Sequence, residues 1–253
     1  MNILEVNNIS YKVKDKYLLK DVSFSLEEGG FYCVVGENGS GKTTLLRCLC
    51  NDLKTSSGEI KIKDKPLKDY SIKQLSKEEA VVFQSDEIAF DFSAMQIVMM
   101  GRMPYQKILS QDSEKDMLIA KECMERTNTW KIKNRNIVDL SGGEKQRVLI
   151  ARCLCQQTPL ILLDEPVSNL DIKHQFEVME LLKSINQDKR VTIFIILHDL
   201  SLAMKYSNYT LAMKDGSLKD FGNTKDVLTE KNIESLFGVK AKITDSYNII
   251  LEK

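Results

Sequence analysis

Stretches that alternate between apolar and polar residues recur in the first quarter of the chain. Alternation with a period of two is typical of strands that bury one face, as in antiparallel sheets. We therefore expect antiparallel strands at Leu4–Val13, Val22–Leu26 and Glu59–Ile62.

Four further segments are almost uniformly apolar. Strands of this kind suit a parallel sheet that is covered on both faces. The segments are Phe31–Val35, Ala80–Phe83, Leu160–Leu163 and Val191–Leu197. The pattern therefore predicts an α/β fold built on a mainly parallel sheet.

The pattern of apolar residues changes between Asp86 and Thr158, where their spacing is mostly helix-like and strand signals are weak. Helices are expected at Gln96–Met100, Ser113–Thr127 and Gly143–Cys155, which indicates a helical subdomain inserted into the sheet domain. The remaining expected elements are a helix at Leu200–Tyr206, a turn at 214–216, short strands, two short helices near Asp226 and Ile233, and a strand-like tail at Asn248–Leu251. No linker or internal repeat divides the chain, so we expect one domain.

Composition narrows the class of protein. The 253 residues carry 36 basic and 36 acidic side chains, which argues against nucleic acid as the main partner. The longest apolar stretch, Val191–Leu197, is far shorter than the roughly 18 residues that a membrane helix needs. The N-terminus begins with strand-like alternation and not with a secretory leader, and the six scattered cysteines are expected to be reduced and packed as small apolar groups.

The segment Gly36–Thr43 reads GENGSGKT and fits the phosphate-binding pattern G-x-x-x-x-G-K-[ST]. It follows the expected strand Phe31–Val35 and precedes leucines at helical spacing, which is the context that the motif requires. Backbone N–H groups of the loop and the helix N-terminus would bind phosphate, Lys42 would reach the β- and γ-phosphates, and the Thr43 hydroxyl would ligate Mg²⁺. We expect the ATP site to include Gly36, Glu37, Asn38, Gly39, Ser40, Gly41, Lys42, Thr43 and Thr44.

Polar residues follow each of the other three apolar strands. Ligands of open α/β sheets bind at the carboxyl ends of the strands, so these residues are expected to share one site with the phosphate loop. Asp164 suits a carboxylate that orients Mg²⁺ and its waters, and Glu165 suits a general base for the attacking water. Gln84 could contact the metal shell or the water without adding charge, and His198 could donate a hydrogen bond to a γ-phosphate oxygen.

A second signature, LSGGEKQR at Leu140–Arg147, precedes the apolar helix Val148–Leu154. Ser141 suits an N-cap, and the glycines after it leave backbone N–H groups open to an anion. Together with the phosphate loop and LILLDEP at Leu160–Pro166, this signature makes the chain resemble the ATP-binding-cassette ATPases over nearly its whole length. Gln84, the turn Ser168–Asp171 and His198 match the remaining motifs of that family in order.

The resemblance implies a P-loop NTPase core of the RecA-like type, with an antiparallel β-subdomain and an inserted α-helical subdomain. Residues 1–85 and 159–253 would form the core with its β-subdomain, and residues 86–158 the helical subdomain. Two copies would pair head to tail around two ATP molecules. Ser141, Gly142 and Gly143 of one copy would then face the γ-phosphate held by Lys42 of the other.

The resemblance assigns two further residues. Asp171 would lie at the dimer interface and link the two ATP sites. Tyr11 lies 25 residues before Gly36, where the family places the aromatic residue that stacks on adenine. The alternative for Tyr11 is a strand tyrosine that is simply packed in the core.

Three segments resemble cassettes that serve importers of siderophores, haem and cobalamin: Gly101–Tyr105 (GRMPY), Leu170–Gln175 (LDIKHQ) and Leu197–Leu200 (LHDL). They imply an ATPase at the cytoplasmic face of the membrane that powers import of a metal chelate, such as an iron-siderophore complex, through separate permease subunits. The permease would dock along residues 84–105, and an extracytoplasmic substrate-binding protein would be an indirect partner. An ATPase for another transported substrate and a soluble cassette that is not part of a transporter are the alternatives.

Overall fold

The computed structural model describes residues 1–84, 91–106, 113–244 and 249–252. Its centre is a six-stranded sheet with the order β10-β9-β3-β8-β7-β6, in which neighbouring strands run parallel except for the antiparallel edge strand β10. The strands are β3 (Phe31–Val35), β6 (Glu79–Val82), β7 (Leu160–Asp164), β8 (Thr192–Ile196), β9 (Tyr209–Lys214) and β10 (Ser217–Asn223). The predicted parallel sheet is therefore present.

Both faces of this sheet are covered, as the uniformly apolar strands predicted. Every residue of β3, β7 and β8 is buried. Alternate residues of each strand join two separate apolar clusters: Phe31 and Cys33 pack on one side, Tyr32 and Val34 on the other. Packing on both faces therefore holds the carboxyl ends of the strands in place.

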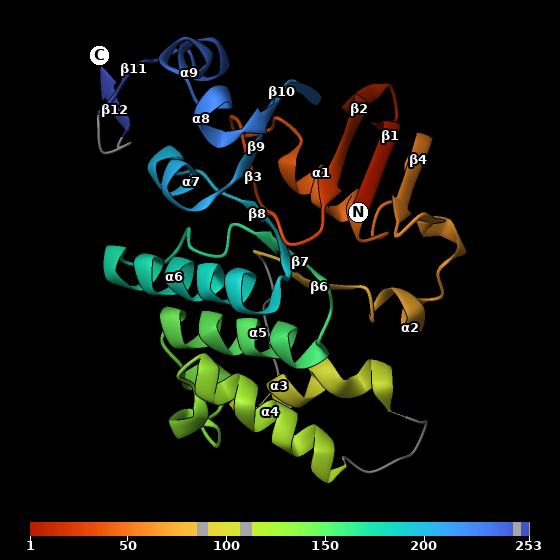
Figure 1. Cartoon of the computed structure of the whole chain (residues 1–253), viewed down its shortest axis with the longest axis vertical. Helices are drawn as coiled ribbons and strands as arrows, with labels where there is room; N and C mark the ends of the chain where they lie inside the picture. Colours follow the sequence, from red (N-terminus) through yellow and green to blue (C-terminus); the bar gives the residue numbers. More distant parts are fainter. Residues whose placement is uncertain (85–90, 107–112, 245–248, 253) are drawn as a thin grey trace.

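An antiparallel sheet with the order β2-β1-β4-β5 closes one face together with α1. Its strands are β1 (Asn2–Val13), β2 (Lys16–Glu27), β4 (Ser57–Ile62) and β5 (Lys65–Pro66), and Figure 1 shows β1, β2 and β4 side by side next to α1 (Lys42–Leu49). The first strand nearly matches its predicted bounds. The strand predicted at Val22–Leu26 begins six residues earlier, because β2 continues through its hairpin with β1.

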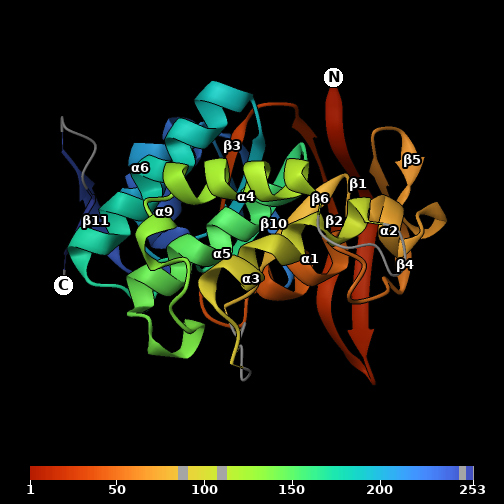
Figure 2. The same ribbon diagram turned by 90° about the horizontal axis from the view of Figure 1, so that it is seen from below.

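Helices cover the opposite face of the central sheet. Figure 1 places α3, α4 and α5 together on that side, and Figure 2 shows the same helices from below. They lie in the chain between β6 and β7, so the inserted helical subdomain is present. The helices in this part are α3 (Ala94–Met99), η2 (Met100–Tyr105), α4 (Glu114–Arg126), η3 (Trp130–Ile132), η4 (Ile137–Asp139) and α5 (Gly142–Gln156).

The C-terminal half adds α6 (Ile172–Lys189), α7 (Leu200–Tyr206), α8 (Thr224–Val227) and α9 (Glu230–Phe237), then the hairpin β11 (Lys240–Ile243) and β12 (Ile249–Glu252). Two short helices, η1 (Leu67–Asp69) and α2 (Ile72–Leu75), precede β6. The first residue of the predicted tail, Asn248, lies outside the described residues, and the rest of that tail falls in β12. No helix in the described part of the chain has both the length and the apolar character needed to cross a membrane.

Besides the earlier start of β2, the bounds of β6 differ from the prediction, and one long helix was absent from it. Strand β6 begins at Glu79 and ends at Val82, so Phe83 lies beyond it. Helix α6 was not predicted, although its buried Val178, Met179 and Leu182 have helical spacing. The exact borders of the helical subdomain at 85/86 and 158/159 stay a prediction, because residues 85–90 lie outside the described part.

Candidate functional site: a phosphate loop at the carboxyl end of the sheet

The loop between β3 and α1 has glycine where a side chain would collide with neighbouring backbone. A Cβ at Gly36 would lie 2.2 Å from the Met213 carbonyl oxygen of β9, and one at Gly41 would lie 2.7 Å from the Leu18 carbonyl oxygen of β2. Gly41, the residue before α1, also has a φ of 99°, which favours glycine. The loop is therefore wedged between β2 and β9, and its backbone is presented at the start of α1.

Lys42 lies at the centre of this loop. Its Nζ donates to the carbonyl oxygens of Gly36 at 2.8 Å and Glu37 at 2.9 Å, and the residue is buried. Burial lowers the pKa of Lys42, while the nearby carboxylates of Glu165 and Asp164 act in the opposite direction. The loop thus holds an amine at the place where phosphate-binding motifs need a cation.

Thr43 and Asp164 come together as the metal prediction required. The Thr43 hydroxyl donates to Asp164 Oδ1 at 3.2 Å, across the start of α1 and the end of β7. Burial raises the pKa of Asp164, and the hydrogen bond from Thr43 partly offsets this effect. A hydroxyl and a carboxylate are hard oxygen donors of the type that Mg²⁺ prefers, so these side chains fit a magnesium site.

Two other predicted catalytic residues contact the side chain of Glu165. Gln84 Nε2 donates to its Oε2 at 2.8 Å, and His198 Nε2 is hydrogen-bonded to its Oε1. The backbone of Glu165 has a φ of 49°, in the left-handed region that few non-glycine residues adopt. The structure thus brings residues from three different strand ends together at the carboxylate of Glu165.

Ser168 belongs to this cluster, although sequence reasoning did not assign it a role. Its Oγ donates to the Glu165 carbonyl oxygen at 3.1 Å and lies 3.4 Å from Gln84 Nε2. The signal was a small polar residue three positions after Glu165, within the turn that matched the family motif. Ser168 therefore contacts both Glu165, the predicted general base, and Gln84.

The signature turn begins α5 in the way that its sequence predicted. Ser141 Oγ accepts from the Glu144 backbone N–H at 3.3 Å, and Glu144 Oε2 accepts from the Ser141 N–H at 2.9 Å, which forms a capping box. Gly142 is exposed, whereas Gly143 is buried. Asp171 caps α6 in a similar manner, through a bond from the His174 backbone N–H.

A cavity of about 390 Å³ connects the strand ends with part of the signature helix. Gln84, Asp164 and Glu165 line it from the sheet, and Gly142 and Lys145 from α5. Ser141, Gly143 and Asp171 are not among the residues that line this cavity. Within one chain, the cavity therefore joins Gln84, Asp164 and Glu165 with Gly142, but not with Ser141 or Gly143.

Tyr11 lies in β1 opposite Leu19 of β2, and it is half-buried. A Leu19 methyl carbon, Cδ2, lies 3.0 Å from the place of a Cβ at Gly41, so the strand pair borders the phosphate loop. A second aromatic residue of this hairpin, Tyr17, is 51% exposed, and Lys12 Nζ lies 5.4 Å from the centre of its ring. Sequence reasoning did not consider Tyr17; the stacking of adenine on Tyr11 stays a prediction.

The chain is similar in sequence to known ATP-binding proteins. Residues 19–168 match the family described as ABC transporter. The hemin import ATP-binding protein HmuV of Pseudoalteromonas translucida is 34% identical over 252 residues, which cover 96% of this chain and 95% of that protein. The iron(3+)-hydroxamate import ATP-binding protein FhuC of Bacillus subtilis is 32% identical over 243 residues, with 96% and 90% covered.

Solved structures agree with the fold. One neighbour is a chain of an ABC transporter described as metal-chelate type, in an inward-facing conformation: the TM-score is 0.87 at 26% identity, with 100% of this chain and 98% of that chain covered. Another is a dimeric ATP-binding cassette in a post-hydrolysis state with ADP and Pi, with a TM-score of 0.77 at 28% identity and 87% and 98% covered. The P-loop NTPase fold is thereby confirmed. The chain belongs to the ABC transporter family, and its resemblance to ATP-binding subunits of hemin and iron-chelate importers is confirmed.

Proposed function

We propose that this chain is the ATP-hydrolysing subunit of an importer for an iron-siderophore or related metal chelate, acting at the cytoplasmic face of the membrane. The observation that carries the ATPase assignment is the cluster of Gln84, Glu165 and His198 beside the phosphate loop. The cargo is inferred from relatives that are named for import of hemin, petrobactin and iron(3+)-hydroxamate.

The residues divide the chemistry among them. Glu165 would accept a proton from the attacking water, and its bonds to Gln84 and His198 hold the carboxylate in one direction. Lys42 and the loop N–H groups would bind the phosphates. Thr43 and Asp164 would hold Mg²⁺, which supplies neutralisation of the charge that develops on the phosphate oxygens.

Three partners follow from this assignment. A second copy would complete each ATP site by bringing Ser141 and Gly143 to the γ-phosphate, since within one chain these residues lie outside the cavity that holds Glu165. Because those contacts bridge two copies, ATP would favour the closed dimer and hydrolysis would release it. The permease, and beyond it a substrate-binding protein, would be the other partners.

The permease is proposed to dock beside Gln84. A groove of about 360 Å³ borders this position and is lined by Ile72, Leu75 and Phe83 among others. Met103 is 64% exposed on η2, which gives a second apolar contact. Other methionines of the predicted docking range contribute to the core. Met99 is buried within the core, and Met95 and Met100 are partly buried and pack against the core. Residues 85–90 of that range lie outside the described part.

Glu165→Gln tests the catalytic assignment. The amide cannot accept the proton of the water, so we expect turnover to fall by about 10²–10⁴-fold while nucleotide binding persists. Multi-angle light scattering of this variant should show a dimer with Mg-ATP and a monomer without nucleotide. A monomer under both conditions would contradict the head-to-tail dimer, and wild-type turnover in the variant would remove Glu165 as the base.

Capture of partners tests the transport assignment. The tagged Glu165→Gln protein, held with Mg-ATP, is expected to retain a polytopic permease from solubilised native membranes, as identified by mass spectrometry. Lys42→Ala, which weakens phosphate binding, provides the matched control and should retain less. Recovery of soluble partners alone would refute the importer function and leave the ATPase assignment intact.

A further inference from the structure

The signature turn packs directly on the turn that precedes α6 in the same chain. A Cβ at Gly142 would lie 3.4 Å from Leu170 Cδ2, and one at Gly143 would lie 2.9 Å from His174 Cδ2 and 3.0 Å from its Cγ. Neither glycine has a positive φ, so backbone conformation does not require glycine here. The His174 ring fills the space that a side chain at position 143 would need.

The same histidine holds the carboxylate of Asp171 with two groups. The His174 backbone N–H donates to Asp171 Oδ1 at 3.0 Å, and its ring Nδ1 is bonded to Oδ2 at 2.7 Å. These two bonds lower the pKa of Asp171, as expected for a carboxylate that is stabilised in its charged form. Both carboxylate oxygens of Asp171 are therefore hydrogen-bonded to a single residue, His174, which lies one helical turn further along the chain.

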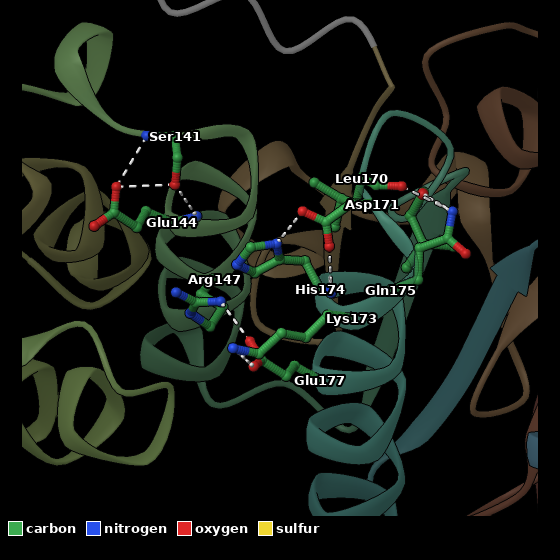
Figure 3. Close-up of polar contacts among 10 residues, drawn as sticks. Ser141, Glu144, Arg147, Leu170, Asp171, Lys173, His174, Gln175 and Glu177 are labelled. Carbon is green, nitrogen blue, oxygen red and sulfur yellow. Dashed lines mark hydrogen bonds and ion pairs between the residues drawn. The ribbon is translucent and has the colours of Figure 1, made fainter.

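Figure 3 shows the His174 imidazole between the first turns of α5 and α6. One turn further along, Arg147 of α5 and Glu177 of α6 form an ion pair with an N–O distance of 3.2 Å. Helix α5 belongs to the inserted helical part, whereas α6 follows the strand that carries Asp164. The two helices are thus joined across the boundary between the helical part and the core.

We propose that His174 is a positioning residue for ATP hydrolysis: it fixes the Asp171 carboxylate and the signature turn relative to each other. This inference rests on the proposed head-to-tail dimer, in which both groups face the ATP held by the second copy. His174 itself is expected to contact neither the nucleotide nor the attacking water. Its effect is that Asp171, Ser141 and Gly143 reach the second copy as one preorganised surface.

Three substitutions at His174 separate this role from simple packing. Asparagine can place an amide N–H near the position of Nδ1, whereas glutamine places it one bond further out and alanine provides none. Loss of a hydrogen bond to a carboxylate at a preorganised surface typically lowers a rate by about tenfold. We therefore expect His174→Ala and His174→Gln to lower kcat of the full-length chain about tenfold with little change in KM, and His174→Asn to recover most of kcat.

A double substitution tests the contact with Gly143. Gly143→Ala alone should be severe, because the new methyl group collides with the ring. In the His174→Ala background the two ring contacts are removed and only the 3.3 Å contact with the Cβ of residue 174 stays, so the two effects on kcat should not add. Lys173→Ala is the matched control, since Lys173 precedes His174, is 80% exposed, and should leave kcat unchanged.

The outcomes are distinct from those that test the proposed function. Absence of ATP turnover in the wild-type chain would overturn the proposed function and this inference together. Normal wild-type turnover with an unchanged kcat in His174→Ala would overturn this inference alone. Equal losses for alanine, glutamine and asparagine with matching drops in Tm would also overturn it, because they indicate a packing role.

Discussion

Glu165 combines an unfavourable backbone conformation with several polar contacts. A non-glycine residue at positive φ typically costs about 1–3 kcal/mol and persists only where its surroundings enforce it. Here Gln84 and His198 bind the carboxylate, and Ser168 binds the backbone carbonyl. The backbone of the proposed base is thus fixed together with its side chain, which is the arrangement that a proton acceptor of defined direction needs.

Glu79 is a residue of a different kind, because nothing in the proposed mechanism uses it. It is the first residue of β6 and is 4% exposed. Its Oε2 has no hydrogen-bond partner among the described residues. Burial raises its pKa well above the ordinary value. The folded chain therefore favours the protonated carboxyl group.

This pKa shift predicts a pH-dependent loss of stability. The contribution of a group whose folded pKa is raised is fully present below its unfolded pKa, about 4.3 for glutamate, and is lost as pH rises toward the folded pKa. Glu79→Gln removes the charge, so we expect about 1–3 kcal/mol higher unfolding free energy at pH 7 and a smaller difference near pH 4.5. Urea unfolding at both pH values measures this, with Glu28→Gln, at an exposed position, as control. An equal difference at both pH values would contradict the assignment.

Among the elements, η2 explains a segment that sequence comparison associated with importers. A Cβ at Gly101 would lie 2.3 Å from the Arg152 carbonyl oxygen, so η2 packs against the backbone of α5. Buried Arg102 binds Asp116 of α4 at 2.8 Å, the Cys155 carbonyl oxygen at 2.7 Å and Gln157 at 2.9 Å. The segment Gly101–Tyr105 therefore joins α4 and α5, and its first two residues hold the helical part together.

Arg102→Ala should unfold this part more readily. Removal of one partner from a buried ion pair typically costs about 3–5 kcal/mol, because the other groups stay buried without compensation. Lys121→Ala provides the control within α4, since its ion pair with Glu125 is exposed and such pairs contribute about 0–1 kcal/mol. Chemical denaturation measures both free energies; equal effects of the two substitutions would contradict a structural role for Arg102.

The predictability of the elements follows from the strength of their local signals. Uniformly apolar strands and the helices α4 and α5 were predicted to within a residue or two. Helix α6 was missed although Asp171 caps it, because its polar residues interrupt the apolar pattern. Strand β6 was displaced by one residue because Glu79, a buried carboxyl group at its start, does not look like a core position.

At the scale of the whole molecule, the grouping of Gln84, Asp164 and His198 could be predicted, because parallel strands bring their carboxyl ends to one edge of the sheet. The contact of His174 with Gly143 could not be predicted in this way. It joins residues of two different helices through the absence of a side chain, and neither helical periodicity nor motif spacing reports on such a contact. Ser168 was missed for a related reason, since its partners lie in separate strand ends.

The position of the inserted helices has a mechanical consequence. They leave the sheet after β6 and return at β7, which pairs with β6, so the two junctions lie at opposite ends of neighbouring parallel strands. Gln84 lies at one junction; at the other, Gln156 Nε2 donates to the Ser76 and Glu79 carbonyl oxygens at 2.7 Å each. Rotation of the inserted helices about the line through both junctions would leave the hydrogen bonds between the strands of the sheet intact. Such a rotation would be opposed by the contacts between α5 and α6, among them the ion pair of Arg147 with Glu177.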